Sequence, residues 1–485
     1  MPDIIKLIKK DEVNLYVDCE MGLLYEISEY FTFEIENARF HPIVRNKLWD
    51  GKIRLLNTQT REIGAGLKDA IIDFCNRRRY QCIIDPELEI NENIPNNLGY
   101  MLSDHTKFQL RDYQNSAILE ALQNKRKILI SPTGSGKSFI IYLIIRYLQS
   151  LNKRILIIVH RTSLITQMMS DFQEYNNDNA IQMTSIRSPS DKQSKDQIII
   201  STWQSIYKEK KEFFEKFDAI IGDEVHTFKA KSLTSIMTKL TNAQYRLGFT
   251  GTLDGSQTNE MALTGMFGPI TKVTTTSKLI ETNVLAQIKI NNLVLTYPQE
   301  ERKKIRKLKP DYHSEMDYIV THEKRNKFIR NLAWSLKGNT LVLFQYVEKH
   351  GKPLYDLISD NKKNVYFVYG GVNTDIREDI RQEVINNSVD AIIIASYGTF
   401  QEGINIPNLH NIILASPSKS QIRVLQSIGR SIRKHESKEY AMIYDIVDNF
   451  SLGSWKNYAV QHFSERLKMY SAEKAFNIKI NNVNF

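Results

Sequence analysis

The residues best suited to chemistry form a glycine-rich stretch, Ser131-Pro-Thr-Gly-Ser-Gly-Lys-Ser138, between two apolar runs. The run before it, residues 128–130, is typical of a buried strand, and the run after it, residues 139–145, is typical of a core helix. Such a turn points backbone N–H groups and a helix N-terminus at one place, which suits a polyphosphate. We expect Lys137 to reach the β- and γ-phosphates of ATP and Ser138 to hold Mg²⁺. The other candidates for contact with the nucleotide are Thr133, Gly134, Ser135 and Gly136.

The stretch departs from the usual P-loop pattern at its first position, where Ser131 replaces glycine. A Gly/Ser turn that only connects a strand to a core helix is the competing interpretation. The strand–loop–helix context favours phosphate binding over that interpretation.

A second cluster, Asp223-Glu-Val-His226, directly follows the apolar run 219–222. Two carboxylates at the end of an apolar strand can hold Mg²⁺ through Asp223 while Glu224 polarises a water for attack on the γ-phosphate. An acidic strand end is more often a turn or a helix cap. Its occurrence together with the glycine-rich stretch favours the catalytic interpretation.

The elements that must position these clusters alternate between apolar strand candidates and helix candidates. The first series of strands is expected at 127–130, 155–159, 197–201, 219–222 and 246–250. A second series is expected at 340–344, 364–368, 390–395, 410–415 and 440–445. This alternation predicts an α/β fold with two parallel sheets, each covered by helices on both faces, and ligands at the carboxyl ends of the strands.

The N-terminal segment differs from the rest of the chain in its charge. The whole chain has a net charge of +10, but residues 1–98 contain 13 Lys/Arg and 17 Asp/Glu, so the remainder carries +14. Within that segment, residues 39–79 hold 10 basic and 4 acidic residues. The overall excess favours a polyanionic partner, although charge alone fits an ordinary solvated face equally well. Short strands, a helix over 66–80 and a polar linker at 91–97 are expected here.

The composition excludes several classes of protein. The three cysteines, Cys19, Cys75 and Cys82, contain no C-x-x-C pair, so we expect neither a zinc site nor a disulfide framework. No apolar run reaches 18 residues, and the N-terminus is charged rather than apolar. We therefore expect a cytoplasmic protein with no membrane partner.

Further motifs accompany the two clusters in a fixed order along the chain. They are Arg111–Gln114, Val159–Leu164, Thr250–Thr252, Ser396–Gly403 and Gln426–Arg433. Their order and spacing resemble those of a superfamily 2 helicase of the D-E-x-H type, over about residues 105–450. The resemblance implies two tandem RecA-like parallel-sheet domains that form an ATP-driven nucleic-acid motor.

The same resemblance implies a role for each motif. The adenine would be gripped by Arg111 and Gln114. Hydrolysis would be coupled to movement by His226, Thr250 and Thr252. The γ-phosphate would be reached from the second domain by Gln426, Arg430 and Arg433, and the nucleotide site would be lined by Gly403 and Asn405. The nucleic-acid backbone would be contacted by Arg161, Thr162, Thr202 and Ser396.

A closer resemblance includes the N-terminal segment. Residues 31–33, 40–42, 49–56 and 84–86 look like parts of the small N-terminal domain of phage helicases that act in recombination and replication control. Members of that family are ATP-dependent 3′–5′ DNA helicases or translocases acting on branched DNA such as forks, Holliday junctions and R-loops. The resemblance implies roles in recombination, repair and replication control, in the host cytoplasm if the protein is phage-encoded. It also implies that Lys52 and Arg54 contact duplex DNA near the branch.

We expect four parts of the chain: a small N-terminal α+β nucleic-acid-binding domain (1–95), an ATP-binding RecA-like domain (100–285), a second RecA-like domain (286–454) and a basic helical tail (455–485).

The expected cofactors are ATP and Mg²⁺. The expected partners of a monomer are branched DNA, RNA within R-loops, and single-strand-binding or recombination proteins. Alternatives are an RNA helicase, a restriction-complex motor, for which no nuclease motif is evident, and a non-catalytic branch-binding or annealing protein switched by nucleotide. Glu224 argues against the last.

Overall fold

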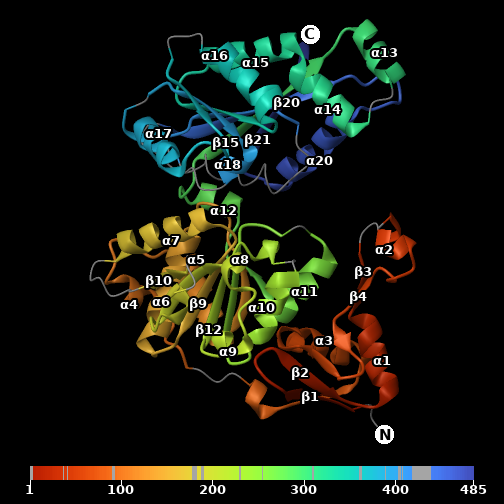
Figure 1. The fold of residues 1–485 in the computed structure, drawn as a ribbon, viewed down its shortest axis with the longest axis vertical. Helices are drawn as coiled ribbons and strands as arrows, with labels where there is room; N and C mark the ends of the chain where they lie inside the picture. The colour runs from red at the N-terminus through yellow and green to blue at the C-terminus, as the bar shows by residue number, and fades with distance from the viewer. Residues whose placement is uncertain are drawn as a thin grey trace. The chain divides into compact units, whose positions relative to one another are not determined.

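The computed structural model of the 485-residue chain describes residues 4–35, 38–40, 42–89, 93–176, 183–186, 190–228, 231–253, 255–308, 311–359, 363–387, 389–401, 406, 408–417 and 438–485. The chain divides into two compact units. The first unit is Met1–Pro132 with Gly136–Thr274, and the second is Thr133–Ser135 with Thr275–Phe485. Each unit contains a seven-stranded parallel sheet, and the first unit also contains a five-stranded sheet (Figure 1).

The five-stranded sheet is formed by the N-terminal segment. Its strands are β1 (Ile4–Lys9), β2 (Asn14–Asp18), β5 (Leu56–Asn57), β6 (Glu62–Gly64) and β7 (Gln81–Ile84), in the order β5-β6-β2-β1-β7. Alternate residues of β1 and β2 are buried, because one face of the sheet packs on α1 (Met21–Tyr30) and α3 (Lys68–Arg78). The helix predicted over 66–80 forms as a 3₁₀ turn, η2 (Ala65–Leu67), followed by α3.

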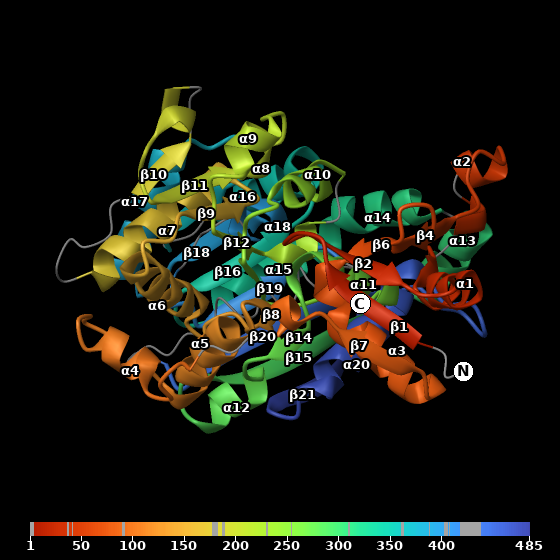
Figure 2. The ribbon, with the colours of Figure 1, turned by 90° about the horizontal axis from the view of Figure 1, so that it is seen from below.

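A short antiparallel pair, separate from this sheet, carries the basic residues Lys52 and Arg54. Strand β3 (Thr32–Glu34) pairs with β4 (Lys52–Arg54), and between them lie η1 (Ala38–Phe40) and α2 (Pro42–Arg45). We call residues 32–54 the arm; Figures 1 and 2 show α2 beyond the end of the β3–β4 pair. Residues 52–56 have the sequence pattern of one strand, but they are divided between β4 and β5, which belong to different sheets.

The first seven-stranded sheet has the order β10-β11-β9-β12-β13-β8-β14. Its strands are β8 (Arg126–Ile130), β9 (Ile155–Val159), β10 (Met183–Ile186), β11 (Ile198–Thr202), β12 (Ala219–Asp223), β13 (Tyr245–Thr250) and β14 (Ile270–Lys272). All five residues of β9 are buried, because helices cover both faces of the sheet. The five predicted strands are confirmed to within one residue at each end, and β10 and β14 were missed.

The helices of this domain form two layers. One layer holds α4 (Leu98–Ser103), α5 (Asp112–Asn124), α6 (Lys137–Ser150) and α7 (Thr162–Tyr175). The other holds α8 (Trp203–Ile206), α9 (Lys211–Phe214), α10 (Lys231–Lys239) and α11 (Gln257–Phe267). Figure 2 shows the two layers on opposite sides of the sheet. The apolar strands between them make this the most extensively buried part of the first unit.

The second seven-stranded sheet has the order β17-β18-β16-β19-β20-β15-β21. Its strands are β15 (Gln287–Thr296), β16 (Thr340–Phe344), β17 (Val365–Val368), β18 (Ile392–Ser396), β19 (Asn411–Leu414), β20 (Tyr440–Asn449) and β21 (Phe476–Asn484). Its helices include α12 (Thr276–Glu281), α13 (Gln299–Leu308), α14 (Tyr312–Thr321), α15 (Glu323–Ser335), α16 (Lys352–Ser359), α17 (Thr374–Asn386) and α18 (Tyr397–Gln401). The five predicted strands form here too, with β20 four residues longer than expected.

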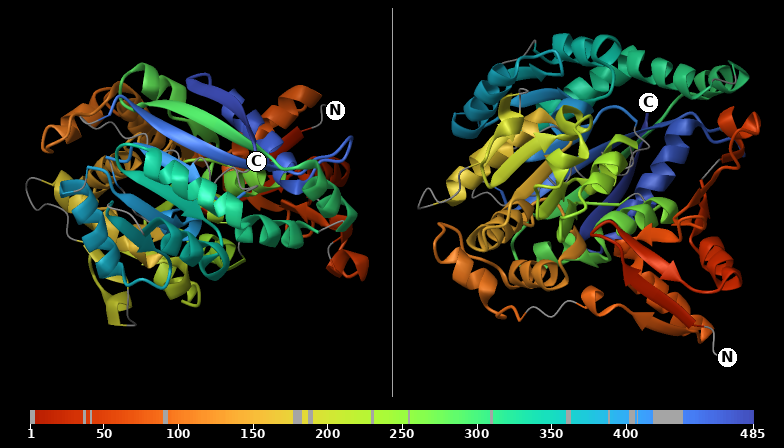
Figure 3. Two further views of the ribbon diagram at one scale, coloured as in Figure 1. Left: turned by 90° about the horizontal axis from the view of Figure 1, so that it is seen from above. Right: turned by 60° about the horizontal axis from the view of Figure 1, so that its bottom comes forward.

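The description of residues 455–485 as a helical tail is wrong. Helix α20 (Tyr458–Ala472) is present, but β21 follows it and pairs with β15 over nine residues (Figure 3). The helix ends at Ala472, and residues 476–480 alternate apolar and polar side chains, as an edge strand does. Helix α20 is also anchored in the second unit, because the Arg466 guanidinium donates to both oxygens of buried Asp445 at 2.8 and 2.9 Å.

Across the described ranges, no helix is both long enough and apolar enough to cross a membrane.

Candidate functional site

The site lies at the carboxyl edge of the first seven-stranded sheet. Strands β9, β12, β13 and β8 are neighbours in that order and run parallel, so their carboxyl ends meet at one edge. Ser131 follows β8, Asp223 ends β12 and Thr250 ends β13. The Ser131 backbone N–H donates to the Thr250 carbonyl at 2.9 Å. The fold thus brings the glycine-rich loop beside the acidic cluster, as the sequence predicted.

The loop between β8 and α6 needs glycine at two positions. Gly134 and Gly136 have φ of +84° and +81°, a left-handed conformation that other L-residues adopt only with strain. Gly136 also caps the N-terminus of α6, and a Cβ there would lie 2.4 Å from Nε2 of Gln114. The backbone can therefore approach a ligand closely at the start of the helix.

Lys137, the first residue of α6, contacts both carboxylates of the acidic cluster. Its Nζ lies 2.8 Å from Asp223 Oδ1 and 2.7 Å from Glu224 Oε1. Burial opposes the charge on the Lys137 amine, but the two carboxylates outweigh it and raise its pKa above the ordinary value. Burial raises the pKa of Asp223. Burial acts in the same direction on Glu224, but Lys137 and His226 stabilise the Glu224 carboxylate and hold the pKa of Glu224 well below its usual range. Glu224 is therefore ionised at neutral pH.

The backbone of Glu224 is strained, with φ of +52° and ψ of +50° in a residue that is not glycine. Strain of this kind costs about 1–3 kcal/mol and is concentrated at functional sites. His226 Nδ1 lies 3.3 Å from Glu224 Oε2 and 2.9 Å from Thr250 Oγ1. Thr250 Oγ1 in turn donates to the Thr252 carbonyl at 2.8 Å. The structure thus joins the three predicted coupling residues to Glu224 by a continuous set of contacts.

The oxygen donors present here fit Mg²⁺. Asp223 uses Oδ1 for both of its contacts, with Lys137 Nζ and with the Glu224 N–H at 3.0 Å, so Oδ2 is available. Within the described ranges, no three His, Cys, Asp or Glu side chains cluster in a way that could hold a metal. A site with one carboxylate and the Ser138 hydroxyl, completed by phosphate and water oxygens, suits Mg²⁺ because this ion keeps several waters.

Gln114 lies against the loop rather than on the surface. It is buried, its Oε1 accepts from the Arg111 backbone N–H at 3.0 Å, and its Nε2 faces Gly136. The side chain therefore ties the N-terminus of α5 to the phosphate-binding loop. This contact is a structural reason for a glutamine at position 114 that the sequence motif did not reveal.

His160 is a site residue whose place near the acidic cluster was not predicted from the sequence. It directly follows β9, and the charges of Glu224, His226 and Lys137 all act on its imidazole. Burial is the main cause that lowers the pKa of His160, to about 4, so the ring is neutral at physiological pH. Its position directly after a buried strand, matching that of Asp223 at the end of β12, is the signal that could have found it.

The predicted nucleic-acid contacts fall into three places. Arg161 and Thr162 are at the start of α7, and Thr202 ends β11, so these three lie at the same sheet edge as Asp223. Thr202 is buried and its hydroxyl is bonded to Ser205 at 3.0 Å. Ser396 ends β18 of the second unit. The others lie in the arm: Lys52 is exposed, as is Arg54, which bonds to Asp50 at 2.5 Å.

Gly403, Asn405, Gln426, Arg430 and Arg433 lie outside the described residues.

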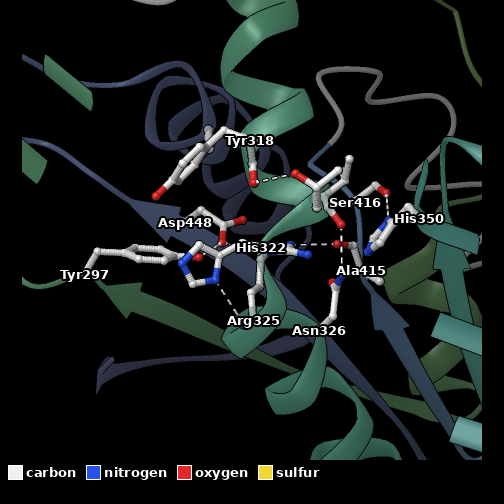
Figure 4. Close-up of polar contacts among 12 residues, drawn as sticks. Tyr297, Tyr318, His322, Arg325, Asn326, His350, Ala415, Ser416 and Asp448 are labelled. Carbon is white, nitrogen blue, oxygen red and sulfur yellow. Dashed lines mark hydrogen bonds and ion pairs between the residues drawn. The ribbon is translucent and has the colours of Figure 1, made fainter. Parts of the chain in front are cut away.

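The carboxyl edge of the second sheet is held by a buried polar network (Figure 4). Arg325 of α15 donates from Nε to Asp448 Oδ1 and from one terminal nitrogen to the Ala415 carbonyl, both at 2.7 Å. The next residue, Ser416, bonds to His350 Nδ1 at 2.9 Å. This network fixes the backbone just after β19.

A phosphate-binding loop and an acidic cluster on one parallel sheet, followed by a second parallel sheet, define a two-domain P-loop motor of the helicase class. Family comparisons agree with this class. Residues 107–255 match the family described as "Type III restriction enzyme, res subunit" and residues 323–435 match "Helicase conserved C-terminal domain". Residues 4–85 match "DNA helicase UvsW, N-terminal".

Relatives of similar length narrow the class to one family. The chain is 37% identical to the ATP-dependent DNA helicase uvsW of Enterobacteria phage T4, over 99% of both chains. A crystal structure of T4 UvsW, 35% identical, matches with a TM-score of 0.52 and covers 99% of both chains. A more distant relative, named DNA 3′-5′ translocase XPB2, of Sulfurisphaera tokodaii, is 26% identical over 76% of this chain and 88% of its own. The chain belongs to the UvsW family of ATP-dependent DNA helicases, and the predicted fold, two tandem RecA-like domains with a small N-terminal α+β domain, is confirmed.

Proposed function

We propose that this protein uses ATP and Mg²⁺ to move 3′–5′ along DNA and to unwind branched DNA such as forks, Holliday junctions and R-loops, in recombination, repair and replication control. The observation that carries the catalytic part is the contact of Lys137 with Asp223 and Glu224 beside a glycine-rich loop. Likeness to the phage T4 helicase over almost the whole chain supports DNA as the substrate. The name of the S. tokodaii relative, a 3′–5′ translocase, supports the direction.

In this proposal each residue of the acidic cluster has a separate task. The phosphates of ATP compete with the two carboxylates for Lys137, which binds the β- and γ-phosphates. Ser138 and Asp223 hold Mg²⁺, which when bound neutralises charge on the phosphate oxygens. Glu224 is ionised and therefore able to orient the attacking water and accept its proton. Through its contacts with His226 and Thr250, a change at the nucleotide site would be transmitted to Thr252.

Further parts of the nucleotide site are proposed from the family resemblance. Arg430 and Arg433, with Gln426, would supply positive charge to the γ-phosphate from the second domain. The site would be completed by Gly403, Asn405, Arg111 and Gln114, together with the loop residues Thr133, Gly134, Ser135 and Gly136. An arginine supplied by a separate domain makes hydrolysis depend on how the two domains are arranged, which is how a P-loop motor couples ATP to movement.

Contacts with the DNA backbone are proposed for Arg161, Thr162 and Ser396, and for Lys52 and Arg54 of the arm. Thr202 would contribute through its backbone, because its hydroxyl is engaged by Ser205. We propose domain boundaries at 1–95, 100–285 and 286–485, with the C-terminal residues as part of the second RecA-like domain. We also propose that the protein acts as a monomer. Its further proposed partners are RNA within R-loops and single-strand-binding or recombination proteins.

A panel of substrates tests the function. Fork, Holliday junction, R-loop, plain duplex and single-stranded RNA would be assayed for stimulation of ATP hydrolysis and for unwinding, with ATP and with a non-hydrolysable analogue. We expect ATP-dependent unwinding of the branched DNA and no unwinding by Lys137→Ala. Stimulation by RNA alone, or unwinding by Lys137→Ala at the wild-type rate, would refute the proposal.

A further inference from the structure

The tip of the arm exposes a group of apolar side chains. Phe40 is 64% exposed, Ile43 46% and Leu48 78%. A single exposed apolar side chain is ordinary on a protein surface, but three within nine residues form a group that needs a reason. None of the three belongs to the buried apolar core of the N-terminal domain. Such a group marks a binding surface.

The charge of the same segment indicates the chemistry of the partner. Residues 38–54 contain one acidic residue, Asp50, and five basic ones, Arg39, Arg45, Lys47, Lys52 and Arg54. A partner of this surface must offer negative charges around an accessible apolar face. DNA at a branch point has both, because the last base pair before the branch lacks a stacking neighbour and is flanked by phosphates.

The tip holds its shape through its own backbone, although it contains little regular structure. The Leu48 N–H donates to the Ile43 carbonyl at 3.0 Å, and the Ile35 N–H donates to the Gly51 carbonyl at 3.0 Å. The Arg39 guanidinium lies 4.8 Å from the centre of the Phe40 ring and covers one of its faces. A surface that is already ordered loses less conformational entropy when it binds.

The base of the arm is tied to the rest of the first unit. The Leu55 N–H donates to the Phe31 carbonyl at 3.1 Å, next to the first residue of β3. Thr258 of α11 donates from Oγ1 to the Glu34 carbonyl at 3.5 Å. Helix α11 begins five residues after Thr252, so the arm contacts the element that directly follows the coupling motif.

We propose that Phe40, Ile43 and Leu48 form a wedge that packs against the terminal base pair at a DNA branch and separates its strands, while the basic residues of the arm hold the flanking phosphates. Apolar side chains that enter a base step unstack it, and aromatic rings stack on bases of any sequence. The proposal rests on the proposed function, because it assumes that branched DNA is the substrate. The wedge adds to that function the place on the protein where the two DNA strands separate.

The test measures base unstacking without ATP, using full-length protein and a fork with 2-aminopurine in the base pair next to the branch. Wild-type protein is expected to raise the fluorescence of this base more than that of the same base within plain duplex. The double variant Phe40→Ala/Leu48→Ala is expected to lose most of this increase, and its preference for fork over duplex to fall about fivefold or more. Tyr25→Ala, which changes a 59% exposed side chain of α1 outside the arm, is the matched control and is expected to behave as wild type.

A second variant separates stacking from charge. Arg45→Ala/Lys47→Ala is expected to weaken binding to fork and to duplex by the same factor and to lower the salt dependence of both, because phosphate contacts carry no preference for the branch.

The outcomes distinguish this proposal from the proposed function. An increase in fluorescence at the branch without ATP-driven unwinding would refute the proposed function but would still support the wedge. Normal unwinding together with a wild-type fluorescence change in Phe40→Ala/Leu48→Ala would overturn the wedge. A change in sedimentation of that variant, with unchanged fluorescence, would also overturn it and assign the tip to an interface between copies of the chain.

Discussion

Replacing Gly66 with alanine is expected to disturb the joint between the N-terminal domain and the helicase domain that follows it. A Cβ at position 66 would lie 1.9 Å from the carbonyl oxygen of Thr264 and 2.7 Å from the backbone nitrogen of Gly268. Both atoms belong to the backbone at the end of α11, so no side chain can move aside. Contacts below 3.0 Å are essentially never found for real Cβ atoms, so the two backbones must separate by about 1.1 Å.

The cost can be estimated from this displacement. A gap of about 0.5–1 Å already forfeits roughly a quarter to a half of each dispersion contact, and overpacking costs about 1–3 kcal/mol in typical cases. Gly64, whose own Cβ would lie 2.8 Å from the Gly265 carbonyl oxygen, shares this interface and separates with it. We therefore expect Gly66→Ala to lower the free energy of unfolding by about 3 kcal/mol, the upper end of that range.

Urea unfolding followed by circular dichroism measures the stability, and amide hydrogen exchange over residues 257–268 locates the change. Gly22→Ala is the matched control, because nothing lies within 4 Å of its Cβ position in α1. There the same substitution is expected to stabilise the protein by about 0.5–1 kcal/mol, as alanine does in a helix. Wild-type stability and wild-type exchange over residues 257–268 in Gly66→Ala would contradict the reasoning.

Four further changes test the two units. Glu224→Gln removes the ionised carboxylate and is expected to abolish ATP hydrolysis while binding of a fluorescent ATP analogue persists; hydrolysis at the wild-type rate would exclude Glu224 as the base. Asp445→Asn leaves the buried Arg466 without its ion pair and is expected to cost about 3–5 kcal/mol in urea unfolding. Asp390→Asn, which removes an exposed carboxylate paired with Lys363, is expected to cost about 0–1 kcal/mol, and equal losses would refute this prediction. Deleting residues 476–485 removes β21 and is expected to increase hydrogen exchange along β15, and unchanged exchange there would contradict the pairing. Burial lowers the pKa of His160 to about 4, so below about pH 6.5 the unfolded chain takes up a proton that the folded chain does not. The free energy of unfolding therefore falls as the pH drops from about 6.5 to about 4. His160→Gln should lessen the difference in unfolding free energy between pH 7 and pH 5, whereas His105→Gln, at an exposed position, should leave it unchanged.

The proximity of the glycine-rich loop and the acidic cluster could be predicted from the sequence because the relevant signals are local. Each of two patterns can be recognised within about ten consecutive residues. One is a buried strand followed by Asp223-Glu224, and the other is a glycine-rich turn that precedes an apolar helix. Parallel pairing then brings the two strand ends to one sheet edge. The strained backbone of Glu224 and the contact of Gln114 with Gly136 could not be predicted in this way, since both depend on how distant segments meet.

The strands that escaped prediction were missed for physical reasons. Residues 287–291 of β15 alternate isoleucine with polar residues, a weaker signal than the apolar runs of its neighbours, although the strand lies between β20 and β21 inside the sheet. Strand β21 is at the sheet edge, and its side chains are mostly exposed, so its sequence is largely polar. Strands β10 and β14 are short edge strands of the first sheet. Apolar content identifies central strands and says little about edges.

The polar stretch at 91–97 reads as a linker, which would make the N-terminal domain a tethered module, but the contacts of the first unit argue for a firm attachment. Glu12 of the N-terminal domain pairs with Arg126 of β8 at 2.6 Å, and its N–H donates to the Thr241 carbonyl at 3.1 Å. Gly64 and Gly66 meet α11 backbone to backbone. Because α11 is packed on the sheet through Leu263 and Phe267, the N-terminal domain must move together with the strands that carry the nucleotide site. Because Thr258 of α11 donates to the Glu34 carbonyl of the arm at 3.5 Å, a displacement of α11 would also reach the arm.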